Sequence, residues 1–390
     1  MQGSREILIS FCLSLTFFVG TYEVQNQLRA MARKSGPVSE PTRMSGDTDD
    51  PALALSWGLL DIHAPSAWKT STGNRNIIVA VIDTGADYHH PDLKQSLWKN
   101  PGESGLDENG FSKETNGTDD DDNGFVDDVH GWDFVNHSPD VMDDQGHGTH
   151  IAGIIAAKKS NGIGSSGVAP DVSLMILKYY DPENSGPENL AFSVQAVRYA
   201  IRMGARIINY SGGGILRSLD EERILRQAAQ KGILVVAAAG NEGLNSDFFH
   251  FYPADYDLPN ILSVTALDRH GQLLHGSNFG KNTVDLGAPG KNIYSTLPGG
   301  EYGYMSGTSQ ATAYVSGAAA LLMSSSIAMN DPQKLIQKLL ATGQDKRSLL
   351  GRTVSGKTLD IESALASHNN EVAQSESTQA RNPAQEKKVF

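Results

Sequence analysis

Short apolar runs rich in β-branched residues recur along the middle of the chain and alternate with segments of helical spacing. Five of these runs have the length of buried strands: Ile77 to Ile82, Leu174 to Leu177, Ile207 to Asn209, Ile233 to Ala239 and Ile261 to Thr265. Strands that are apolar on both faces are typical of parallel sheets covered by helices on both sides. The pattern therefore predicts a three-layer α/β fold with a mostly parallel central sheet.

Apolar residues at helical spacing predict helices between and after these strands. Asn189 to Met203 and Leu219 to Lys231 are two such segments, and each is followed by a glycine. A third helix is expected near the end of the chain, because Asp331 is a good N-cap, Pro332 fits a first helical turn and Gly343 ends the apolar pattern.

The two ends of the chain differ from this middle part. An apolar run from Ile7 to Gly20 follows Arg5, and it has the length of a signal-peptide core rather than of a spanning helix. It predicts a secreted, periplasmic or cell-envelope location, with an uncleaved membrane tether as the alternative. We expect four segments: a signal peptide or anchor (1–20), a linker or short pro-segment (21–49), one α/β domain (50–366) and a disordered polar tail (367–390).

Composition narrows the function classes. The 390 residues are 39% hydrophobic and carry a net charge of −13, which would repel nucleic acid and anionic membrane surfaces. Cys12, the single cysteine, lies inside the N-terminal apolar run. The exported body would therefore contain neither a disulfide nor a cysteine nucleophile.

Three segments place a reactive side chain where open α/β folds bind ligands. Asp83 ends the first predicted strand, His147 begins a segment of small residues between two glycines, and Ser309 opens another such helix. Taken singly, Asp83 and His147 each have an alternative explanation. Asp83 could cap a turn, and His147 could bind a metal with His150, although the glutamate of zinc peptidases is missing.

Together, the order Asp83, His147, Ser309 with these glycines resembles that of the subtilisin-like serine peptidases. A fourth segment, residues 236–243, resembles the segment that supplies their oxyanion-hole asparagine, here Asn241. The resemblance covers about residues 50–366 and implies a subtilisin-like fold and a serine endopeptidase. Ser309 would be the nucleophile, His147 the general base and Asp83 its orienting partner. We expect protein or peptide substrates and a monomer.

The resemblance also implies that an extended substrate pairs with two exposed strand edges. One edge is formed by Ser211, Gly212 and Gly213. The other falls on Ser185 and Gly186, where a plain turn is an equal alternative.

The first specificity pocket would lie between the Ser211–Gly213 edge and the strand that contains Ala238 and Gly240. Phe251 precedes a Tyr-Pro-Ala segment and is expected at the base of this pocket. A ring there predicts a shallow pocket that favours medium apolar side chains over large aromatic ones. The alternative is that Phe251 turns away.

Three residues near the nucleophile depart from the family pattern, which usually has Met, Pro and His where this chain has Gln310, Ala313 and Tyr314. Ala313 replaces a rigid proline, so a peptide ligase or transpeptidase on the same site is an alternative function. An inactive binding module is a second alternative, against which the intact reactive residues count.

Residues 119–128 place acidic or amide oxygens at alternating positions with a glycine at the sixth, which is the first half of a calcium loop. We expect structural Ca²⁺ here, and the alternative is a solvated acidic loop. The expected ligands are Asp119, Asp121, Asn123, the Phe125 carbonyl, Asp127 and Asp128. A second site is predicted more weakly from family ligands, at Asp92, Asn161 and Asp50, each of which could equally be a turn residue.

Overall fold

The computed structural model describes residues 50–367, and the predictions for residues 1–49 and for the tail beyond Ser367 lie outside this range. Within it, nine strands form one sheet. From edge to edge they are β10 (Gln344–Asp345), β11 (Lys357–Thr358), β7 (Leu286–Pro289), β6 (Ile261–Leu267), β5 (Leu234–Ala238), β4 (Ile207–Tyr210), β1 (Ile78–Asp83), β3 (Ser173–Lys178) and β2 (Gly131–Asp133).

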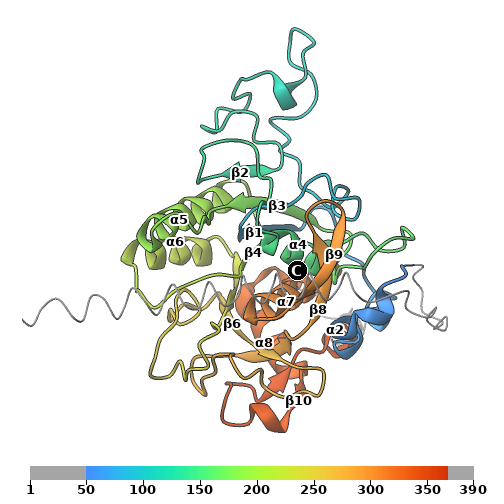
Figure 1. Ribbon diagram of the computed structural model, residues 1–390, viewed down its shortest axis with the longest axis vertical. Helices are drawn as coiled ribbons and strands as arrows, with labels where there is room; N and C mark the ends of the chain where they lie inside the picture. Colours follow the sequence, from blue (N-terminus) through green and yellow to red (C-terminus); the bar gives the residue numbers. More distant parts are fainter. Residues whose placement is uncertain (1–49, 368–390) are drawn as a thin grey trace, which may run out of the picture. The chain divides into compact units, whose positions relative to one another are not determined.

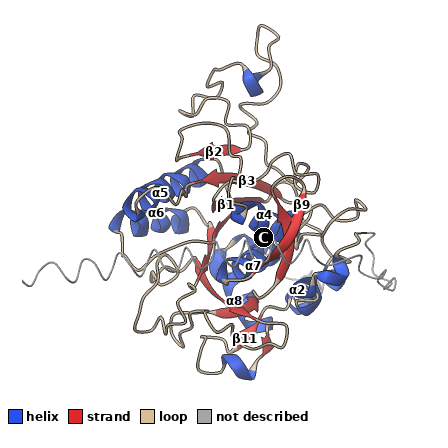
Figure 2. Cartoon of the chain, in the orientation of Figure 1, coloured by secondary structure: helices blue, strands red, loops and turns tan. Residues whose placement is uncertain are grey.

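Helices cover both faces of this sheet (Figures 1 and 2). The α-helices are α2 (Trp57–Asp61), α3 (Ala64–Ala67), α4 (His147–Ala156), α5 (Gly186–Arg202), α6 (Leu219–Gln230), α7 (Thr308–Ser325) and α8 (Pro332–Thr342). Short 3-10 helices are η1 (Leu53–Leu55), η2 (Lys113–Thr115), η3 (Ile327–Asn330) and η4 (Arg347–Leu349). Strands β8 (Ile293–Leu297) and β9 (Glu301–Met305) form a separate antiparallel hairpin.

Alternate residues of the central strands face two separate cores. In β1, Val79 and Val81 pack with α4 and α7, whereas Ala80 and Ile82 pack with α5 and α6. Every pairing among β2 to β7 and β1 is parallel, and β10 is the antiparallel edge strand. The predicted three-layer α/β fold is therefore confirmed. The five predicted strands correspond to β1, β3, β4, β5 and β6, with ends shifted by one or two residues.

Helix α7 lies at the centre of the larger core. Its residues from Thr308 to Met323 are all buried, and it packs against α4 and against β4 to β7. Small residues make this close packing feasible, because a Cβ on Gly317 would lie 2.6 Å from the Val168 side chain. The helix that carries Ser309 is thereby held on all sides.

The register of the sheet brings the predicted site residues to one edge. Asp83 pairs with Lys178 at the ends of β1 and β3, and Tyr210 at the end of β4 pairs with Ala237 of β5. The segments that follow β4 and β5 leave the sheet side by side at this carboxyl edge, where α/β folds bind ligands. Among residues 50–367, none of the helices combines the length and apolar character needed to span a bilayer.

Candidate active site

Asp83 and His147 form a close pair at the carboxyl edge of the sheet. The His147 Nδ1 lies 2.7 Å from an Asp83 oxygen that also accepts the Thr84 N–H at 2.8 Å. The side chain of Asp83 is 3% exposed and that of His147 is 33% exposed. Burial disfavours the imidazolium, but the charge and hydrogen bond of Asp83 outweigh this effect and raise the pKa of His147 above 6.5. The remaining ring nitrogen of His147 is thereby left for chemistry.

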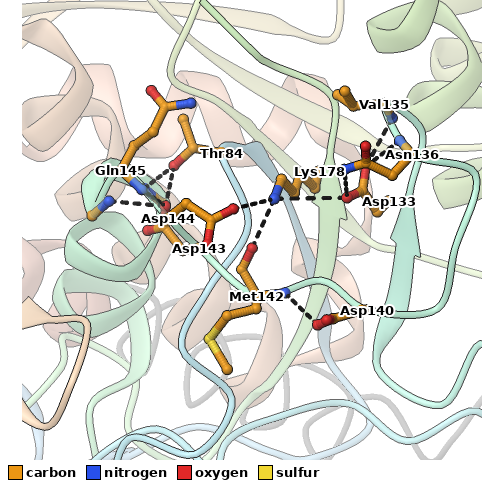
Figure 3. A network of polar contacts seen from close by, with 12 residues as sticks. Thr84, Asp133, Val135, Asn136, Asp140, Met142, Asp143, Asp144, Gln145 and Lys178 are labelled. Carbon is orange, nitrogen blue, oxygen red and sulfur yellow. Dashed lines mark hydrogen bonds and ion pairs between the residues drawn. The ribbon is translucent and has the colours of Figure 1, made fainter.

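A second buried carboxylate, Asp143, fixes the start of helix α4. One oxygen accepts from the Thr84 hydroxyl and from the backbone of Gln145, as Figure 3 shows, and the other accepts from the Thr149 N–H and hydroxyl. Sequence reasoning missed Asp143, although an acidic residue just before a helix is a known N-terminal signal. Its charge also contributes to the raised pKa of His147.

The positive charge of Lys178 offsets the negative charge of the acidic residues in the loop at residues 140–146. Figure 3 shows its ammonium group bound to the Met142 carbonyl (2.9 Å) and to Asp144 (3.1 Å), with Asp133 3.7 Å away. The residue is buried at the end of β3, beside the end of β1. A buried ammonium group with several partners of this kind ties the 140–146 loop to the sheet.

Close backbone approach places His147 against Asp83. A Cβ on the next residue, Gly148, would lie 2.0 Å from the Gly85 carbonyl oxygen. The glycine after the histidine is therefore required by contact, and not only by exposure of the imidazole.

Ser309 is the second residue of helix α7 and is 7% exposed. Its hydroxyl donates to the Ser211 carbonyl at 2.8 Å, and the Ser211 hydroxyl donates back to the Ser309 carbonyl at 3.2 Å. The Ser309 hydroxyl proton is therefore directed at the backbone of the segment that follows β4.

The Asn241 side chain is oriented by Thr308. Its Oδ1 accepts from the Thr308 N–H (2.9 Å) and hydroxyl (3.2 Å). Because the oxygen is bound in this way, the NH₂ end is the part of the amide that remains free to donate near the start of α7.

The two predicted substrate-binding edges lie outside the strands of the sheet. The segment Ser211–Gly213 follows β4 directly, and the next residue, Gly214, forms an antiparallel bridge with Tyr252. No strand is formed at Ser185 and Gly186, and pairing of a substrate there stays a prediction. Ser185 instead caps helix α5 in a capping box with Glu188, and Gly186 is the first residue of that helix.

The Phe251 ring lies between the two predicted pocket strands. A Cβ on Gly213 would lie 2.6 Å from this ring, and one on Gly240 would lie 3.0 Å from it. Ala238 is the buried last residue of β5. Asp255 holds the backbone in place, because its carboxylate accepts the Phe251 N–H at 2.8 Å.

The polar side chains of the acidic loop form two groups, and those of the first group hydrogen-bond to other parts of the protein. Asp128 accepts from the side chains of Asn100 (2.7 Å), Asn123 (2.9 Å) and Tyr199, so both of its oxygens are bound within the protein. Asp127 accepts the Gly117 N–H. The Phe125 ring packs edge-on against Trp132 and Tyr199.

Asp119 and Asp121 instead meet a residue that sequence reasoning missed, Glu103. One oxygen from each of the three carboxylates lies within 4.8 Å of the others. Glu103 is fully buried, and its Oε2 has no hydrogen-bond partner within the described residues. Burial raises the pKa of Glu103, and so do Asp128, Asp120 and Asp121, against one backbone hydrogen bond that lowers it. Hard oxygen ligands with an orphaned buried oxygen fit a calcium ion.

The second predicted cation site does not fit. Asp50 accepts from backbone N–H groups of residues 160–162 and from the Ser166 hydroxyl. Asp92 accepts from the Asn161 amide and, at 2.8 Å, from the Tyr302 hydroxyl. Hydrogen-bond donors hold the positions that a cation would need, so no metal is assigned to these residues.

Comparisons with known proteins agree on one family. The model of the subtilase family matches residues 74–362. The thermophilic serine proteinase of Bacillus sp. (strain AK1) is 37% identical over 268 residues, which are 69% of this chain and 57% of that protein. The major intracellular serine protease of Bacillus subtilis (strain 168) is 36% identical over 314 residues, 80% of this chain and 86% of that protein. A protease structure from Pseudoalteromonas arctica PAMC 21717 has a TM-score of 0.65 at 23% identity. The match covers 82% of this chain and 99% of the chain in that structure.

Proposed function

Because the chain belongs to the subtilase family and is a serine-type endopeptidase, we propose that Ser309, His147 and Asp83 are its catalytic triad. The observation that carries the proposal is the 2.7 Å contact between Asp83 and His147 at the carboxyl edge of the sheet. Ser309 reaches the same edge, because its hydroxyl binds the Ser211 carbonyl just after β4, the strand paired with β1. The same arrangement counts against the inactive binding module.

In the proposed reaction, Ser309 Oγ attacks the substrate carbonyl and its proton passes to the free ring nitrogen of His147. Asp83 holds the ring by its other nitrogen and stabilises the imidazolium that forms. The Asn241 amide and the Ser309 backbone N–H donate to the oxyanion. His147 then returns the proton to the leaving amine, and water repeats the sequence to release the acyl group.

Labelling with a fluorophosphonate probe tests the assignment. The protein should be labelled at Ser309, and Ser309→Ala should remain folded, lose labelling and lose activity by at least about 10⁴-fold. The control is Ser306→Ala, because Ser306 is exposed and lies two residues before the helix that carries Ser309. Activity retained by purified Ser309→Ala would refute the triad.

We also propose that Glu103, Asp119 and Asp121 bind a structural Ca²⁺. The converging carboxylates and the unpartnered Glu103 oxygen support this. Bound calcium would neutralise repulsion in the insert and take no part in the reaction, because the insert and the Asp83–His147 pair are built from different segments.

The proposed location is outside the cytoplasm, in the medium, the periplasm or the cell envelope. Its support is the apolar run from Ile7 to Gly20 behind Arg5, together with a body that contains no cysteine. Relatives include a protease named as intracellular. Mass spectrometry of the mature protein from cell fractions decides, because an intact N-terminus in the cytoplasm would exclude export.

A further inference from the structure

One buried amide side chain, that of Asn278, holds the turn that carries Asn241. It is 1% exposed and reaches both sides of the turn. Its Nδ2 donates to the Ala239 carbonyl (2.9 Å), and its Oδ1 accepts from the backbone N–H groups of Glu242 (3.2 Å) and Leu244 (2.9 Å). A single side chain thus replaces the backbone pairing that β5 loses when it ends.

Asn278 also contacts the two residues next to Asn241. Its backbone N–H donates to the Gly240 carbonyl at 2.9 Å, and its Nδ2 donates to the Glu242 carboxylate at 2.7 Å. Gly240 has a φ of +104°, and a Cβ there would lie 2.4 Å from Asn278 Nδ2. The glycine therefore lets the amide lie directly against the turn.

We propose that Asn278 is a positioning residue that sets where the Asn241 amide meets the developing oxyanion. Thr308 fixes the rotation of that amide through its oxygen, whereas Asn278 fixes the backbone from which the side chain projects. Donors of this kind act only when they are preorganised at the place where charge develops. A loosened turn therefore weakens transition-state binding more than substrate binding.

The test is Asn278→Ala, assayed with a peptide amide substrate. We expect kcat to fall about 10- to 100-fold while KM changes less than about threefold. Asn260→Ala is the matched control, because Asn260 is also 1% exposed and its Nδ2 donates to the Ile233 carbonyl at 2.9 Å, just before the opposite end of β5. Both variants should lower the melting temperature, but Asn260→Ala should leave kcat unchanged. An unchanged kcat for Asn278→Ala, or an equal loss in both variants, overturns the inference.

A double-mutant cycle with Asn241→Ala separates this inference from the proposed function, on which it rests. If Asn278 acts through Asn241, then Asn278→Ala should cost less than about twofold in kcat once Asn241 is already alanine. The same cost in both backgrounds overturns the inference alone. Full kcat in Asn241→Ala overturns the oxyanion role of Asn241 itself.

Asn278→Asp is the variant to use if alanine does not fold. It has the same shape and keeps the oxygen that accepts from Glu242 and Leu244. Its second oxygen would face the Ala239 carbonyl and the Glu242 carboxylate, so we expect the same loss of kcat at pH 8. A kcat equal to that of the wild type overturns the inference as well.

Discussion

Two buried carboxylates, Asp143 at the catalytic edge and Glu103 in the acidic insert, are satisfied in opposite ways. Both oxygens of Asp143 accept hydrogen bonds from the protein. Glu103 has one oxygen without a partner in the described residues, and its carboxylate lies close to those of Asp119 and Asp121. Asp143 is therefore satisfied within the protein, whereas the insert leaves a buried acceptor unpaired at the place where we propose that Ca²⁺ binds.

The largest expected effect of this difference is on stability. Removing calcium from the full protein should lower its melting temperature by about 5 to 10 °C, since a ligand at 100 times its Kd contributes about 2.7 kcal/mol and a domain of this size loses about 2 to 4 °C per kcal/mol. The kcat/KM of the protein that remains folded at 25 °C should change less than twofold. Calorimetry and kinetics with calcium or with a chelator measure both. Equal melting in the two conditions would make the insert a plain solvated loop.

Glu103→Gln tests the same comparison more closely. It removes a proposed calcium ligand, and it also removes a negative charge that repels Asp119 and Asp121. With calcium the variant should melt below the wild type, and with a chelator it should melt at or above it. The exposed residue Glu108 in the same insert supplies the control, and Glu108→Gln should follow the wild type in both conditions.

An intermediate effect is expected at the specificity pocket. Phe251→Gly should increase cleavage after Phe relative to cleavage after Leu by about 10- to 200-fold, which corresponds to the 1 to 3 kcal/mol that an apolar pocket discriminates. The control is Phe249→Gly, because Phe249 lies in the same loop with 61% of its surface exposed. A peptide-library profile that prefers Phe or Tyr in the wild type, and that Phe251→Gly leaves unchanged, would show that the ring does not limit the pocket.

The smallest expected effect is on the pH profile. Proton acceptance requires neutral His147, so kcat/KM should fall as the pH drops through the pKa of His147, which the Asp83 carboxylate raises above the ordinary value for histidine. Asp143→Asn removes a charge that raises this pKa, so the acid limb should move to lower pH. Asp144→Asn should leave it in place, because Asp144 is 81% exposed and binds Lys178 instead. An acid limb that moves equally in both variants would mean that Asp143 has no specific influence on His147.

Structural features set by residues close together in the chain could be predicted from the sequence. Features that depend on residues brought together by folding could not. The five central strands were predictable because each is a continuous apolar run. The start of α5 was misplaced at Asn189 because the Ser185 and Glu188 capping box was not recognised. Glu103 lies 16 residues before Asp119, outside any local spacing rule, and only the folded insert brings the two together.

The central position of α7 has a consequence for biosynthesis. Asp83 and His147 leave the ribosome long before Ser309, and the helix that bears Ser309 is buried on all sides against strands made earlier. A nascent chain therefore contains no assembled form of the proposed site until α7 has docked, and residues made later, such as Leu335 of α8, still have to join the larger core. Contacts between segments far apart in the chain form slowly. Assembly of the proposed site and burial of the helix that carries Ser309 are therefore parts of one folding event.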